Sequence, residues 1–204
     1  MLAEILRFLK GTPSSTELTP YSTAGFSLHE VRGISVTVTN TRPDIDTVQV
    51  IARLDRSLGL IDRYTPHYFR HLEKDFGFID VRRFACRGAY FPEIRACLVE
   101  LTFTVNPEFT DAEVAATILH EAMHARLHLL GFPLEMEDRA RQERFCRRAE
   151  IEFGHLVPNG ERVLERAKWT ADLSDEEVAP VIDPILASQR IAEVDRQALE
   201  KRAT

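Results

Sequence analysis

The sequence has few cysteines, no excess of positive charge and no long apolar run, and each shortage excludes a class of protein. Its three cysteines, Cys86, Cys97 and Cys146, are odd in number and form no CxxC pair. This pattern argues against a disulfide framework and excludes a thiolate zinc ribbon. The formal net charge of -6 disfavours a nucleic-acid binder, because phosphate contacts require a clustered positive surface.

The sequence also shows no pattern typical of a membrane-spanning helix or of a secretory signal peptide. No stretch approaches the roughly 18 apolar residues that a membrane-spanning helix requires. Residues 1–10 mix apolar residues with charges and lack the basic start and cleavage site of a signal peptide. Free thiols suit a reducing compartment. We therefore predict a cytoplasmic protein with no nucleic-acid or membrane partner, and its oligomeric state stays open.

The hydrophobic periodicity predicts an α+β protein with a small, mainly antiparallel sheet and additional helices near both ends. Residues 34–39 and 76–84 alternate in the manner of strands, as do residues 98–105, whose apolar face is Val99, Leu101, Phe103 and Val105. Gly88 and Pro92 indicate turns around a short strand between the last two. Helices are expected at residues 1–10, 44–60 and 66–75, with a loop at 11–25.

Two further helices have clear ends. Thr110 and Glu113 form a capping box before residues 111–130, and Gly131 and Pro133 follow that helix. The second covers residues 135–153 and is expected to end at Gly154. A charged helical segment follows from residue 174. We predict one domain at residues 1–173, with its core at 76–158, and a helical extension at 174–204.

The sequence His120-Glu121-Ala122-Met123-His124 lies in the middle of the helix expected at residues 111–130. Histidines four residues apart share one face of a helix, so both imidazoles can reach a single metal ion. Glu121 can then lie beside the metal and take a proton from metal-bound water. The helix is apolar nearly all round, and burying two histidines and a glutamate without a common partner would be costly. A bound zinc ion, one per chain, removes that cost.

A catalytic zinc usually has three protein ligands, so a third must come from elsewhere. The extended pattern HExxHxxGxxH, which would supply a third histidine, is excluded because positions 127 and 130 are both leucine. His128 lies one turn beyond His124, and three successive turns of a straight helix do not converge on one ion. Glu143 and Glu150 both fall within the apolar stripe of the following helix. Glu143 is the predicted ligand; Glu150 is the alternative, or else orients a histidine.

With Glu143 on the second helix, the HExxH motif resembles that of the gluzincin metallopeptidases. The resemblance covers residues 76–158, and the chain is closer in size to minimal single-domain zincins. It implies that His120, His124 and Glu143 bind zinc and that Glu121 is the general base. The implied activity is hydrolysis of peptide bonds by metal-activated water, with a peptide or protein as substrate.

Several assignments stay open at this level. An oxyanion requires another donor, for which His155 and Tyr90 are candidates. Zincin substrates lie along a sheet edge, and residues 98–105 are the expected edge. The main alternative function is a zinc-binding regulator or sensor with little peptidase activity. An interaction domain with a coincidental motif and a hydrolase of non-peptide amides are further alternatives.

Overall fold

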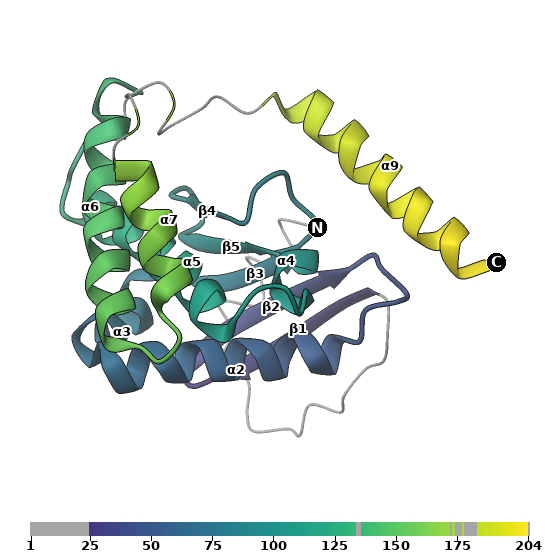
Figure 1. Ribbon diagram of the computed structural model, residues 1–204, viewed down its shortest axis with the longest axis horizontal. Helices are drawn as coiled ribbons and strands as arrows, with labels where there is room; N and C mark the ends of the chain where they lie inside the picture. Colours follow the sequence, from purple (N-terminus) through teal and green to yellow (C-terminus); the bar gives the residue numbers. More distant parts are fainter. Residues whose placement is uncertain (1–24, 134–135, 172, 174–176, 178–182, 204) are drawn as a thin grey trace.

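The computed structural model describes residues 25–133, 136–171, 173, 177 and 183–203, and this part of the chain has an α+β fold (Figure 1). A five-stranded open sheet is formed with the strand order β1-β2-β3-β5-β4. The predicted helix at 1–10, most of the loop at 11–25 and the start of the predicted extension at residues 174–176 lie outside the described residues.

The sheet is mixed, so the prediction of a mainly antiparallel sheet was wrong. β1 (Gly25–Val31) pairs antiparallel with β2 (Ile34–Asn40), and β4 (Gly88–Phe91) pairs antiparallel with β5 (Ala96–Glu100). β3 (Phe78–Arg82) lies between β2 and β5 and is parallel to both. Parallel pairing needs a long connection, and α2 (Thr47–Tyr64) with α3 (Pro66–Asp75) provides it between β2 and β3. The sequence pattern also missed β1.

One face of the sheet carries the main hydrophobic core. Register places Val36, Ile79 and Cys97 in one row across the central strands, and Val38, Val81 and Val99 in the next. All six side chains are buried in a cluster that also includes residues of α2, α3 and the HExxH helix. On β4, Tyr90 pairs with Cys97 and Gly88 with Val99, so these two residues belong to the same face.

The strand predicted at residues 98–105 ends at Glu100, and the chain turns into the short helix α4 (Leu101–Val105). The Glu100 carboxylate accepts hydrogen bonds from the Phe103 backbone N–H at 2.6 Å and from the Thr102 hydroxyl at 2.7 Å. These bonds cap the helix by giving a backbone N–H of its first turn a hydrogen-bond partner. Their stabilisation of a helix outweighs the preference of the alternating pattern for a strand. In the strand order β5 lies between β3 and β4, so it is an interior strand. The free edge on this side of the sheet belongs to β4 and not, as the sequence pattern had indicated, to residues 98–105.

The HExxH helix, α5 (Asp111–Leu129), confirms the prediction at both ends. Glu113 N–H donates to the Thr110 hydroxyl at 3.2 Å, and Thr110 N–H donates to the Glu113 carboxylate at 2.9 Å, which completes the capping box. Gly131 follows with a φ of 75°, the left-handed conformation that ends a helix. The helix is buried over most of its length, as its apolar composition predicts.

The next helix, α6 (Met136–Leu156), continues past Gly154, so the prediction that it ends there was wrong. A Cβ at Gly154 would lie 2.9 Å from Leu164 Cδ2, and one at Gly160 would collide with the Gly154 carbonyl. The glycines thus permit close contact with α7 (Glu161–Ala171), a helix that the sequence pattern did not predict. α6 and α7 lie side by side at one end of the sheet (Figure 1).

The last helix, α9 (Pro184–Ala203), lies within the predicted extension and contacts the rest of the chain through Asp195. Asp195 accepts hydrogen bonds from Arg42 at 2.9 Å and from Arg83 at 3.0 Å. Of the helices that the structure describes, none combines the length and the apolar character needed to cross a membrane.

Candidate metal centre

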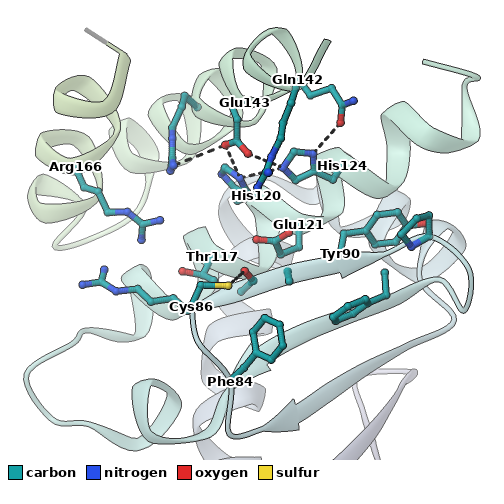
Figure 2. Close-up of a pocket in the computed structure, with 17 residues that line it drawn as sticks. Phe84, Cys86, Tyr90, Thr117, His120, Glu121, His124, Gln142, Glu143 and Arg166 are labelled. Atoms are coloured by element: carbon teal, nitrogen blue, oxygen red, sulfur yellow. Dashed lines mark hydrogen bonds and ion pairs between the residues drawn. The ribbon is translucent and has the colours of Figure 1, made fainter. Parts of the chain in front are cut away.

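His120, Glu121 and His124 lie at the contact between α5 and α6, beside the edge strand β4 (Figure 2). His120 and Glu121 are each only 6% exposed, and His124 is partly buried. The capped helix α5 holds the two imidazoles one turn apart on one face, as the spacing predicts.

The Nε2 atoms of His120 and His124 are 3.2 Å apart, and the Glu143 carboxylate from α6 lies next to both of them. One Glu143 oxygen lies 3.1 Å from His120 Nε2, and the other lies 3.3 Å from His124 Nε2. Glu143 is 7% exposed, so this cluster is largely screened from solvent. The structure therefore brings together the three side chains that the sequence analysis selected as metal ligands.

The outer nitrogens of both imidazoles have partners on the same helix, α6. His120 Nδ1 lies 2.8 Å from Glu150 Oε1, and His124 Nδ1 lies 3.2 Å from Gln142 Oε1. The Gln142 amide also donates to the Pro133 carbonyl at 2.5 Å, which fixes its oxygen toward His124. Glu150 thus lies where a partner that orients His120 would lie, and Glu143 lies against both Nε2 atoms, where a metal ligand would lie.

The donor set fits a divalent cation. A carboxylate and an amide oxygen only accept hydrogen bonds, so both Nδ1 atoms carry protons, and with a metal bound both imidazoles would be neutral and would offer it their Nε2 lone pairs. Zinc holds nitrogen ligands at about 2.0–2.1 Å in a tetrahedron, which separates neighbouring ligand atoms by about 3.3 Å. The observed separations of 3.1 to 3.3 Å agree with that spacing. Two imidazoles and one carboxylate are also ligands that zinc favours.

The same cluster binds protons tightly in the absence of a metal. Burial by itself lowers the pKa of His120, but hydrogen bonds with Glu143 and Glu150 raise it to about 10. Burial opposes ionisation of Glu143 and Glu150 as well, yet hydrogen bonds from the histidines lower the pKa of Glu143 and bring that of Glu150 to about 2. A positive charge is therefore stabilised between these carboxylates.

Glu121 lies on the pocket side of the cluster. Its carboxylate lines a cavity of about 640 Å³ that also contains His120, His124 and Glu143. Burial raises the pKa of Glu121, the nearby histidine charges lower it, and the charges of Glu143 and Glu150 raise it further, with a net increase. A carboxylate with a raised pKa is suited to accept a proton near neutral pH.

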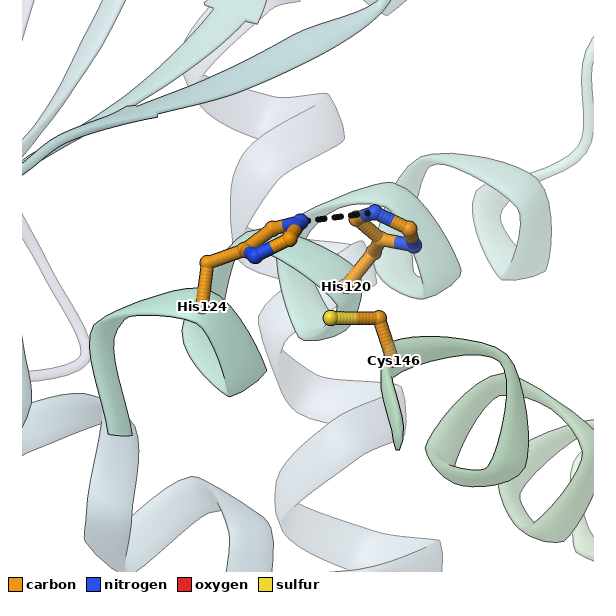
Figure 3. A group of neighbouring side chains, drawn as sticks. All are labelled: His120, His124 and Cys146. Carbon is orange, nitrogen blue, oxygen red and sulfur yellow. Dashed lines mark hydrogen bonds between the residues drawn. The ribbon is translucent and has the colours of Figure 1, made fainter. Parts of the chain in front are cut away.

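Cys146 is a third potential metal-binding side chain beside the two histidines (Figure 3). Ligand atoms of His120, His124 and Cys146 all lie within 4.8 Å of one another. Burial, reinforced by the charges of Glu143, Glu121 and Glu150, raises the pKa of this thiol well above its ordinary value. The Glu143 oxygens lie directly against the two Nε2 atoms, at 3.1 and 3.3 Å, so the geometry favours Glu143.

The two candidate oxyanion donors occupy different places. Tyr90 lines the pocket, and its hydroxyl lies 3.1 Å from His128 Nδ1. His155 is exposed near the end of α6 and does not line the pocket, so the structure does not bring it to the site. His128 contacts Tyr90 in the described part of the chain, in keeping with its exclusion from the ligand set.

Sequence reasoning missed several residues at the site. Gln142 and Cys146 were recognisable only by their helical spacing around Glu143, since one is its neighbour and the other lies about one turn away. Arg166 lines the pocket from α7, a helix without a clear sequence signal. Comparisons with protein-family models, curated proteins and solved structures found no match. The functional assignment therefore rests on the geometry of the residues themselves and on the motif.

Proposed function

We propose that this protein is a zinc-dependent metallopeptidase in which His120, His124 and Glu143 hold the ion. The observation that carries the proposal is the convergence of two imidazole nitrogens and one buried carboxylate at separations of 3.1 to 3.3 Å. When bound, a zinc ion supplies a Lewis acid that polarises a carbonyl oxygen and makes water acidic near neutral pH.

Glu121 is the proposed general base. It is adjacent to a proposed ligand in sequence, lines the same cavity, and is held by a helix that is capped and buried. Its carboxylate accepts a proton from the attacking water and then delivers that proton to the leaving amine. A regulatory zinc site has no need of a carboxylate in this position, so Glu121 favours catalysis over the alternative of a zinc-binding sensor.

The edge strand β4 supports a peptide as the substrate. Gly88 and Tyr90 belong to the face of the sheet that α5 covers, and both line the cavity with Glu121. An extended peptide can add to a free strand edge through its backbone hydrogen-bonding groups. The expected platform is thus β4, one strand further out than the edge that the sequence pattern indicated.

The proposal is tested by zinc content and peptide cleavage, measured for the wild type and Glu121→Gln. Wild type should contain one zinc per chain and cleave peptides. Glu121→Gln should keep the zinc and lose about 10²-fold or more in rate, because general base catalysis contributes that much. Zinc without cleavage in the wild type would favour the sensor alternative. No zinc after reconstitution would overturn both.

A further inference from the structure

The cavity beside the proposed catalytic base is basic, although the chain as a whole has a formal charge of -6. Four arginines line it, at positions 87, 139, 147 and 166, against the two carboxylates of Glu121 and Glu143. A concentration of guanidinium groups in an acidic protein is not required by the peptidase chemistry. It therefore points to a property of the ligand.

Two of these arginines already have assigned partners. Arg147 donates to both Glu150 oxygens, at 2.8 and 2.9 Å, and Arg139 has a partner of its own. Arg87 and Arg166 differ: among the residues that the structure describes, neither guanidinium forms an ion pair or a hydrogen bond with a carboxylate. Glu150 lies near Arg166 but is occupied by His120 and Arg147.

Arg87 is held in place by aromatic rings. Its guanidinium lies over the rings of Phe109, at 4.4 Å, and Phe103, at 5.2 Å. Arg166 extends from α7 toward the side of the pocket where Thr117 lies (Figure 2). Burial lowers the pKa of Arg87, and the positive charges of Arg166 and Arg162 lower it further against the opposing charge of Glu113, so the guanidinium groups of Arg87 and Arg166 repel one another. An anion between them would relieve this repulsion.

We propose that Arg87 and Arg166 form a binding site for a substrate carboxylate beside the scissile bond. Guanidinium groups bind carboxylates through paired hydrogen bonds, and a partly buried site strengthens that attraction. This proposal rests on the proposed peptidase function and names the class of substrate: peptides that carry a negative charge next to the cleaved bond.

The direction of β4 indicates on which side of the bond the carboxylate lies. β4 begins at Gly88, directly after Arg87, and proceeds to Tyr90 and Phe91. Antiparallel pairing is slightly more stable than parallel pairing. A peptide added antiparallel to β4 therefore brings its C-terminal part to Arg87 and Arg166. The carboxylate belongs either to an acidic residue after the cleaved bond or to a free C-terminus.

The test compares matched peptides that differ only in charge. The acidic residue after the cleaved bond is present or replaced by its amide, and the C-terminus is free or amidated. We expect kcat/KM to be roughly tenfold or more higher for the peptides with the recognised carboxylate, as a charged hydrogen bond contributes that much. Whichever substitution removes the preference identifies the source of the carboxylate.

Variants then assign the preference to the two arginines. Arg166→Gln and Arg87→Gln should abolish it, and Arg166→Glu should shift cleavage toward peptides with a lysine at that position. This gain of a new preference excludes a folding defect as the cause. Lys168→Gln removes a positive charge from the exposed side of the same helix and should leave the preference unchanged.

Titration of the same peptides into the Glu121→Gln variant measures recognition without cleavage. Tighter binding of the acidic peptide, lost when Arg166→Gln is added, would support the carboxylate site even if the wild type cleaved nothing and the peptidase function had failed. Conversely, cleavage of all peptides with equal efficiency, unchanged by Arg166→Gln, would overturn the carboxylate site and leave the peptidase function standing.

Discussion

Glu143 and Glu150 contact opposite nitrogens of one imidazole, which gives two similar carboxylates different parts in the site. Glu143 lies at Nε2 of His120, where it also reaches His124, and Glu150 lies at Nδ1. Arg147 pairs with Glu150 at 2.8 Å and lies 3.9 Å from Glu143. Glu150 thus accepts a hydrogen bond from His120 and is itself held by Arg147, and together these contacts anchor the ring.

This difference predicts the metal affinities of three variants of α6. Glu143→Gln should lose stoichiometric zinc, because it removes a charged ligand. Glu150→Gln should keep zinc but weaken its binding by about 10- to 100-fold, the usual effect of an orienting partner. Cys146→Ala, about one turn from Glu143, should bind zinc as the wild type does. Competition with a chromophoric chelator measures all three affinities.

The Cys146 variant is the matched control, since it changes a neighbouring buried side chain on the same helix. Zinc loss in Cys146→Ala with zinc retained in Glu143→Gln would reverse the assignment and make the ligand set His120, His124 and Cys146. Circular dichroism of each variant would show that α6 has remained folded.

Cys86 is the half-buried thiol that lines the pocket, and its reactivity depends on pH in a predictable direction. Burial and the Glu121 carboxylate raise its pKa to about 11, so the thiol stays protonated through neutral pH. In protein stripped of metal, alkylation of Cys86 should rise with a midpoint near pH 11, well above the ordinary value of 9.0. Mass spectrometry of the Cys86 peptide measures the rate.

Removal of the Glu121 charge provides the control for this prediction. Glu121→Gln should lower the midpoint for Cys86, because an anion nearby disfavours the thiolate. A midpoint near pH 9 in both proteins would show that neither burial nor Glu121 acts on the thiol as the structure indicates.

At the scale of elements, the site depends on the close approach of β4 to α5 at Gly88. A Cβ at this position would lie 2.7 Å from Thr117 Cγ2 and 2.9 Å from Glu121 Oε1. Gly88→Ala should displace the strand or the Glu121 carboxylate. A displacement of about 1 Å at a reacting group can reduce kcat/KM by about 10²-fold. We also expect about 1–3 kcal/mol of destabilisation from the added methyl group.

Peptide cleavage and thermal unfolding together test this prediction, with Gly154→Ala as the matched variant. At Gly154 the new methyl group would lie 2.9 Å from Leu164 Cδ2 and 3.0 Å from Leu164 Cγ, so this substitution should also destabilise the fold, but away from the site. Gly154→Ala should therefore lower the Tm and leave kcat/KM close to that of the wild type. If Gly88→Ala cleaved peptides normally, β4 would not be the strand that places substrate beside Glu121.

At the scale of the whole molecule, α9 is anchored through a shared carboxylate. The Asp195 side chain is 19% exposed, and its partners Arg42 and Arg83 are 9% and 11% exposed. Removing the Asp195 carboxylate leaves both guanidinium groups without this hydrogen-bond partner and should lower the free energy that holds α9 in place by about 1–2 kcal/mol. Asp195→Ala should therefore increase hydrogen exchange in Pro184–Ala203.

Glu193→Gln is the control for α9, because Glu193 is exposed and bonds only to Arg196 and Gln197 within the described part of the chain. It should leave the protection of the helix unchanged. Equal exchange in Asp195→Ala and the wild type would mean that the Asp195 contacts do not hold α9.

Metal removal should affect the stability of the whole molecule, because the proposed ligands join α5 in the core to α6. A ligand that binds only the folded state adds about 2.7 kcal/mol when its free concentration is about 100 times Kd. A chelator should lower the Tm, and added zinc should restore it. A Tm that the chelator leaves unchanged, in protein shown to hold zinc, would contradict this coupling.

Local signals in the sequence were sufficient for several elements. The capping box at Thr110 and Glu113 and the glycine at position 131 act within one turn of the chain, so both ends of α5 could be predicted. The prediction of one strand at 98–105 was wrong beyond Glu100, because a second local signal competes with the alternating pattern there. Glu100 caps a helix by bonds to Phe103 and Thr102, and this capping overrides the alternation of apolar residues.

Sheet order and the α6–α7 contact could not be predicted, because they depend on packing between distant segments. Parallel pairing of β3 with β2 and β5 follows from the path of the connecting helices, which no local pattern encodes. Gly154 has the sequence signature of a helix end. Its role as a contact point for α7 appears only when Leu164 is placed against it.

The sequence by itself determined the pair His120 and His124 with Glu121 between them, because helical spacing alone puts both imidazoles on one face. Only the tertiary structure distinguished Glu143 from Glu150, since both lie in one apolar stripe and the packing of α6 on α5 decides which reaches Nε2. It also placed Arg166 in the cavity and made β4 the free edge. These features join segments far apart in the chain, and their distances are set by the packed core.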